Sequence, residues 1–203
     1  MKRILIFSFL TIFAARASFA QTTYTEKRQV SGFDEVTFAV SGEVLISLGR
    51  DFSVELEGDR DYIREIITKV DDDELIIRRN KWFDSGNKKV IVRITMPVLD
   101  GISVLGSGRL TVIDPLRGDE LDVAISGSGK AFLRDVALRE VECDISGSGS
   151  LNLTGNGTIR KLEISISGSG DYVGDDTTIG IMDARISGSG SCDCHVTEML
   201  RAS

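Results

Sequence analysis

One five-residue motif, Ile-Ser-Gly-Ser-Gly, recurs four times in this chain and constrains its fold more than any other feature. The copies occupy residues 125–129, 145–149, 166–170 and 186–190. Their first serines are Ser126, Ser146, Ser167 and Ser187, so the steps between copies are 20, 21 and 20 residues. A fixed period of this size is typical of a stacked repeat architecture.

Apolar and polar residues alternate on both sides of each motif. The positions five, three and one before the first serine are filled by Leu121/Val123/Ile125, Val141/Cys143/Ile145, Leu162/Ile164/Ile166 and Met182/Ala184/Ile186. A period of two indicates β-strands and excludes helical solenoids. One repeat cannot bury its apolar side alone, so the repeats must stack around a shared core. We therefore predict an all-β fold, a parallel β-helix with about 20–21 residues per coil and a glycine-rich corner.

The N-terminal third follows the same alternation less regularly. Val36, Phe38 and Val40 precede a Ser-Gly turn, and the pattern resumes after it, as in an imperfect copy of the later repeat. Asp59 is a candidate N-cap for one or two helical turns that extend to Ile67.

The first twenty residues have the features of a secretory signal peptide. Lys2 and Arg3 precede an apolar run, and Ser18 and Ala20 are small residues at the predicted cleavage site. We predict that residues 1–20 are removed, that 21–32 are a disordered leader and that 33–203 form one β-helix domain. No other apolar run is long enough to cross a membrane. The protein is therefore expected to be exported to the periplasm, the outer-membrane surface or the medium.

Removal of Lys2, Arg3 and Arg16 changes the formal charge from −7 to −10. Such an acidic domain is a poor partner for nucleic acid, whose phosphates bind lysine and arginine.

Three further stretches support a family resemblance. These are Gly32-Phe33-Asp34, Lys89-Val90-Ile91-Val92 leading to Met96-Pro97, and the repeated Ile-Ser-Gly-Ser-Gly. Over about residues 33–194 the chain resembles the family described as "putative auto-transporter adhesin, head GIN domain". The resemblance implies a single-stranded, right-handed, pectin-lyase-like β-helix, a role in cell-surface adhesion and no established catalytic residues.

Four acidic residues occupy the same outward position in successive repeats. They are Asp122, Glu142, Glu163 and Asp183. Stacked one strand apart, they would repel one another, and a bound Ca²⁺ would relieve that repulsion. The alternative is that they are solvated, with some neutralisation by Lys161 and Arg185. We predict no other cofactor.

Aromatic residues flanked by cations provide the best candidate for a ligand contact. Trp82 and Phe83 lie next to Arg79 and Lys81 in a polar segment, and such groups suit sugar rings or a protein partner. Alternatively, Trp82 packs over an end or side of the β-helix and shields it.

The thiols lie on inward positions. Cys143, Cys192 and Cys194 fall on columns otherwise filled by apolar residues, so we expect them to pack as small hydrophobic side chains rather than to bind metal beside His195.

These observations favour a non-enzymatic, exported binding module of the cell envelope or surface, such as an adhesin that contacts glycans or a protein. The alternative is a polysaccharide-active lyase or hydrolase on the same scaffold, which would need converging acids in a cleft. Because β-helices must protect their end coils, residues 196–203 either fold over the last coil or form part of a homo-oligomer interface. Oligomers through the faces of the β-helix are a further possibility.

Overall fold

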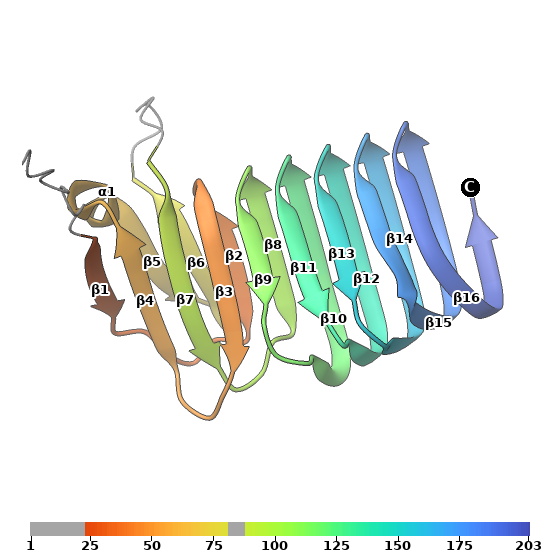
Figure 1. Ribbon diagram of the computed structural model, residues 1–203, viewed down its shortest axis with the longest axis horizontal. Coiled ribbons are helices and arrows are strands. Elements are labelled where there is room, and N and C mark those ends of the chain that lie inside the picture. The colour runs from red at the N-terminus through yellow and green to blue at the C-terminus, as the bar shows by residue number, and fades with distance from the viewer. Residues whose placement is uncertain (1–22, 81–87) are drawn as a thin grey trace, which may run out of the picture.

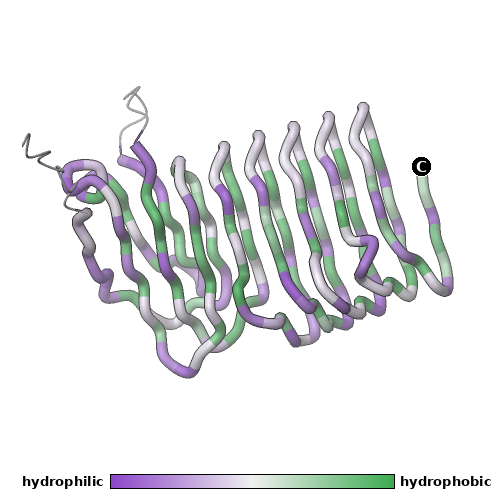
Figure 2. Tube along the Cα trace, in the orientation of Figure 1, coloured by the Kyte–Doolittle hydropathy of each residue, from purple (hydrophilic) through white to green (hydrophobic). Residues whose placement is uncertain are grey.

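A computed structural model describes residues 23–80 and 88–203, and the predicted signal peptide lies outside them. The strands of this part of the chain form one continuous sheet wound into the predicted parallel β-helix, which Figure 1 shows from the side. Along the winding chain, apolar and polar residues alternate, as Figure 2 shows. Nothing in the described residues forms a helix long and apolar enough to cross a membrane.

The repeats form two long sides that meet at the glycine corner. The first face contains the strands that lead into the corner, β8 (Gly101–Gly106), β10 (Arg117–Gly127), β12 (Ala137–Gly147), β14 (Gly157–Gly168) and the end of β15 (Asp171–Gly188). The second face contains the strands that leave it, β9 (Arg109–Val112), β11 (Lys130–Arg134), β13 (Ser150–Thr154), the start of β15 and the start of β16 (Ser191–Ala202). The third, short side contains the first residues of the long strands, for example Arg117 of β10 and Ala137 of β12.

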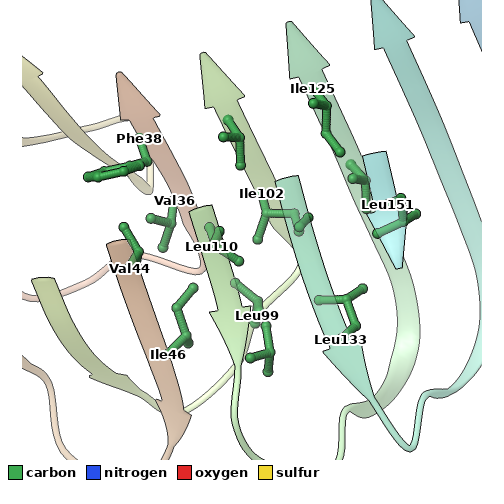
Figure 3. Packing of buried hydrophobic residues seen from close by; sticks show 14 of the residues in the cluster. Val36, Phe38, Val44, Ile46, Leu99, Ile102, Leu110, Ile125, Leu133 and Leu151 are labelled. Carbon is green, nitrogen blue, oxygen red and sulfur yellow. The ribbon is translucent and has the colours of Figure 1, made fainter. Parts of the chain in front are cut away.

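On the first face, neighbouring coils from β8 to the end of β15 keep one register, whereas the pairing of β15 with β16 contains two register shifts. Ile125, Ile145, Ile166 and Ile186 occupy one register position on four successive strands. The inward residues of both faces are buried except in the last coil, where Ile186 and Cys192 are partly buried. Figure 3 shows Ile102 and Leu110 of the two faces pointing into the same core. The predicted apolar columns are therefore confirmed.

Glycine is required at the corner because adjacent coils approach closely there. Gly147 has φ +109°, and a Cβ atom on it would lie 2.6 Å from the carbonyl oxygen of Gly127. That oxygen accepts a hydrogen bond of 2.7 Å from the backbone N–H of Ser148. An L-residue would be strained in this conformation and would also push the two coils apart.

The N-terminal third does not stack in sequence order. The coil formed by β2 (Glu35–Ala39) and β3 (Gly42–Leu48) lies between two later segments of the chain. On one side it pairs with β8 and β9, and on the other with β6 (Glu74–Arg79) and β7 (Val90–Met96). The coil of β2 and β3 therefore comes first in the chain. The next strands, β4 to β7, lie on its N-terminal side, and the chain then continues on its other side with β8.

Antiparallel strands and one short helix form the N-terminal end of the β-helix. β4 (Ser53–Gly58) pairs antiparallel with β7, and β5 (Ile66–Asp71) pairs antiparallel with β6. Helix α1 (Arg60–Arg64) follows the predicted N-cap, and Oδ1 of Asp59 accepts hydrogen bonds from the N–H groups of Asp61 and Tyr62. The predicted N-cap and helical turn are confirmed, but the predicted extension to Ile67 is wrong, because Ile66 and Ile67 pair with β6 as the start of β5.

The prediction that residues 21–32 are a disordered leader is wrong for residues 24–28. They form β1 (Tyr24–Arg28), which pairs antiparallel with β4. Two interactions fix this strand in addition to the ladder. The ring of Tyr24 packs against the core, and the guanidinium of Arg28 donates hydrogen bonds to the carbonyl oxygens of Ile63 and Ile66.

The last residues extend the stack rather than folding over it. Along β16, Val196 pairs with Ile179 and Leu200 pairs with Met182, so the strand follows the path of the coil before it. Leu200 is 56% exposed.

Candidate functional site

The aromatic contact candidate is described only in part. Lys81, Trp82 and Phe83 lie outside the described residues. Arg79 belongs to β6, where its Nη2 lies 2.6 Å from Oε2 of Glu65 and its guanidinium lies over the ring of Tyr62, 5.0 Å from the centroid. Arg79 is therefore engaged in the packing that joins β5, β6 and α1.

The four predicted acidic residues do stack in register on the first face. Two cations neutralise the C-terminal part of this acidic column. Nζ of Lys161 lies 2.6 Å from carboxylate oxygens of both Glu140 and Glu163, and Nη2 of Arg185 lies 3.2 Å from Asp183. The hydrogen bond from Lys161 lowers the pKa of Glu163, and the same carboxylates raise the pKa of Lys161.

The column continues toward the N-terminal end, beyond the predicted residues. Asp122 is in register with Gly101, and Gly101 with Glu35. Small residues here leave a shallow depression of about 270 Å³, bordered by Glu35, Glu74 and Asp122. Burial, and then the charges of Asp34 and Glu74, raise the pKa of Glu35.

The carboxylates form a ladder, whereas calcium needs a cage of converging oxygens. In residues 23–80 and 88–203, no three His, Cys, Asp or Glu side chains are grouped so that they could hold a metal ion.

The calcium hypothesis has a direct thermal test. Binding to the folded state alone would raise the melting temperature with ligand concentration. Because Lys161 and Arg185 already neutralise part of the column, we expect the same melting temperature, within about 1 °C, in millimolar calcium and in chelator. A shift of several degrees that disappears in the Asp122→Asn/Glu142→Gln variant would instead establish a calcium site.

The three thiols lie in the core, as predicted. Cys143 is buried, and Cys192 and Cys194 are partly buried against the same core. Burial raises the pKa of Cys143, and burial together with the neighbouring Cys194 raises the pKa of Cys192 to about 12. Since the thiolate is the reactive form, Cys143 and Cys192 are poor nucleophiles at neutral pH.

A group of cations that the sequence did not single out lines a groove on the second face. This basic groove, of about 640 Å³, lies where β3, β7, β9 and β11 begin, and its charged lining residues are Glu43, Glu57, Lys89, Arg109 and Lys130. Ser107 and Ser128 of the corner also line it.

The strand register explains this grouping. Glu43 pairs with Arg109, and Arg109 pairs with Lys130, so three adjacent strands carry a charged side chain at their first or second residue. Lys89 directly precedes Val90, which pairs with Gly42. One sequence signal was available, because Arg109 and Lys130 both follow the second glycine of a corner motif.

The guanidinium of Arg109 stacks on the ring of Phe132, 4.6 Å from its centroid. Glu57 forms an ion pair with Arg93 on the neighbouring strand. These contacts hold one cation and one carboxylate of the groove in defined positions.

A comparison with family models decides the classification of this fold. The model described as "Putative auto-transporter adhesin, head GIN domain" matches residues 32–203. The chain belongs to this family. The resemblance inferred from the glycine motifs is thus confirmed, and the head GIN match includes the strands from β2 onward as well as the regular repeats. A search of curated protein sequences gave no match.

Solved structures share the fold of this head GIN chain at low identity. A "putative adhesin" from Parabacteroides distasonis has 18% identity and a TM-score of 0.66, covering 89% of this chain and 97% of that one. One from Bacteroides fragilis has 20% identity and a TM-score of 0.64, covering 91% and 98%. A "putative lipid binding protein" from P. distasonis has 18% identity and a TM-score of 0.68, covering 91% and 95%. At these identities the likeness supports the fold alone.

Proposed function

We propose that the protein is an exported, non-enzymatic binding module of the cell envelope or surface, an adhesin that contacts a glycan or protein partner. Membership of the head GIN family supports a surface binding module. The features of a signal peptide in residues 1–20 support export. The contact surface we assign is the second face.

The observation that carries this assignment is the difference between the inward and outward residues of the second face. Inward positions are apolar and mostly buried, with Cys192 and Cys194 of the last coil partly buried. One outward row instead contains Thr111, Phe132, Asn152 and Val173 on four adjacent strands. A rigid, flat sheet with varied outward side chains is suited to recognition, because little conformational freedom is lost on binding.

The alternative of a polysaccharide-active enzyme has less support from the geometry. Glycosidases place two carboxyl groups on opposite sides of a bound sugar ring. Here the acids form a ladder along an open face, and ion pairs with Lys161 and Arg185 occupy two of the four predicted members. This arrangement favours a binding protein.

A binding experiment with face-specific variants tests the proposal. The mature protein, residues 21–203, is applied to a glycan array and to immobilised cell-surface material. We expect binding to a defined subset of ligands and no release of reducing or unsaturated sugars. The Thr111→Lys/Val173→Lys variant should weaken binding at least tenfold, because the added side chains prevent close contact with the second face.

The matched control introduces the same charge on the other side. Ala124→Lys/Ser165→Lys adds two lysines to outward positions of the first face. The control should bind like the unmodified protein. Loss of binding in the control alone would transfer the contact surface to the first face, and sugar release would support the enzyme alternative.

A further inference from the structure

We propose that the basic groove is a binding site for an acidic sugar unit of a glycan, held through its carboxylate or sulfate group. This inference rests on the proposed binding function and adds to it a location and a ligand class. The groove extends across the beginnings of four adjacent strands, β7, β3, β9 and β11. At about 4.8 Å per strand the width is about 14 Å, enough for an oligosaccharide segment rather than a single ion.

Within residues 23–80 and 88–203, the cations of the groove are not neutralised by salt bridges. Lys89, Arg109 and Lys130 form no ion pair in the described part of the chain, although the whole chain has 31 acidic and 24 basic residues. Arg109 and Lys130 are moreover directly adjacent in register. Like charges in this position repel one another. A bound anion would remove that repulsion, which gives the site a physical reason to prefer a negatively charged ligand.

Arg109 is positioned for this interaction. Its guanidinium lies over the ring of Phe132, and the residue is exposed, so the stacked side chain is accessible to a ligand. A planar guanidinium matches a carboxylate or sulfate with two parallel hydrogen bonds. Lys89 and Lys130 add point charges on either side of it.

The acidic residues of the same groove favour a sugar over a polyanion. Glu43 and Glu57 offer carboxylate oxygens that accept hydrogen bonds from hydroxyl groups, and Ser107 and Ser128 can donate or accept. A nucleic acid or an anionic membrane would instead bring dense phosphate charge against these carboxylates and against a chain of net charge −7.

The apolar surface also argues against a membrane. The large hydrophobic side chains that are exposed in the described residues are Val98, Leu105, Ile113, Val173, Met199 and Leu200, and none of them lines the groove. A lipid-binding site would need apolar side chains to enter the acyl region.

The test measures the affinity of the mature protein for oligogalacturonate of six units, with a neutral maltohexaose of the same length beside it. We expect binding of the acidic oligosaccharide that weakens with added salt, since exposed charge interactions are screened, and at least tenfold weaker binding of the neutral one. Lys89→Ala/Lys130→Ala should lower the affinity for oligogalacturonate at least tenfold.

Arg117→Ala/Arg160→Ala removes two exposed arginines that likewise form no ion pair in the described residues and lie away from the groove. This control should retain the affinity within twofold. Inorganic phosphate and phosphatidylglycerol vesicles serve as further probes, and binding of either one as tightly as oligogalacturonate would overturn the choice of an acidic sugar.

The failure of this inference can be distinguished from failure of the proposed function. If the unmodified protein binds glycans or a protein through the second face, but Lys89→Ala/Lys130→Ala binds oligogalacturonate as tightly as the unmodified protein, the groove proposal is wrong and the binding function stands. If the protein binds no acidic oligosaccharide, the groove proposal is also wrong. If neither the array nor the cell-surface material gives any binding, the proposed function fails as well.

Discussion

Replacement of Gly147 by alanine is expected to destabilise the β-helix by about 3 kcal/mol or more, because backbone strain and a steric clash act together. The positive φ of this residue disfavours any side chain, and the new methyl group would lie 2.6 Å from the carbonyl oxygen of Gly127. Gly147 pairs with Gly127 and with Gly168, so neither neighbouring coil can move away without disturbing the next. Equilibrium denaturation in urea, followed by circular dichroism, measures the loss.

Gly106 provides the matched control for this prediction. It has a similar φ of +101°, but a Cβ atom on it would meet nothing within 4 Å. Gly106→Ala should therefore show the backbone strain alone, about 1–2 kcal/mol. Equal losses in the two variants would show that the close approach of coils does not contribute, and that conformation alone selects glycine at the corner.

Truncation of Tyr172 to alanine should produce the second large effect, about 3–5 kcal/mol, because it leaves a cavity in the core. Tyr172 is fully buried and pairs in register with Leu151 and Cys192. Its ring extends along the strand over Gly174, where a Cβ atom would lie 2.5 Å from the phenol oxygen. Gly174 occupies the column that contains Leu153 in the preceding coil. A larger residue does not fit there because the ring of Tyr172 fills the space.

Tyr172→Phe separates the packing of the ring from the hydroxyl group. The hydroxyl is buried, and it has no hydrogen-bond partner among the described residues. Removing an unsatisfied polar group from a core is neutral or stabilising, so this variant should retain its stability within about 0.5 kcal/mol. A loss above about 1 kcal/mol would mean that the hydroxyl is satisfied in solution, for example by a buried water molecule.

The regular repeats could be predicted from the sequence because the alternation within each strand and the spacing between repeats indicate the same arrangement. The step of 20 or 21 residues places identical positions side by side, so the columns that contain Ile125 and Cys143 follow directly from counting. The acidic column follows in the same way. Its neutralisation does not, since the contacts of Lys161 with Glu140 and Glu163 depend on side-chain conformations that spacing cannot specify.

The N-terminal third could not be ordered from its pattern. The alternation in residues 35–48 predicts a coil, but the same alternation fits any place in the stack. Its position between β7 and β9 depends on the path of the chain through β4, α1 and β5. The alternation of apolar and polar residues carries no information about that path. The basic groove was not predicted for this reason. Lys89 lies near Arg109 and Lys130 only because β3 is placed between β7 and β9.

The residue-for-residue register has a consequence for the length of the molecule. Excision of residues 130–149 would remove β11 and β12 and join Gly129 to Ser150. β10 would then lie beside β14, and the inward positions of one strand would face the inward positions of the other in the same register. The molecule would then be shorter by one coil, about 4.8 Å, with the N-terminal layers unchanged. Gain or loss of whole coils during evolution would thus change the length of this scaffold in fixed steps of one strand spacing.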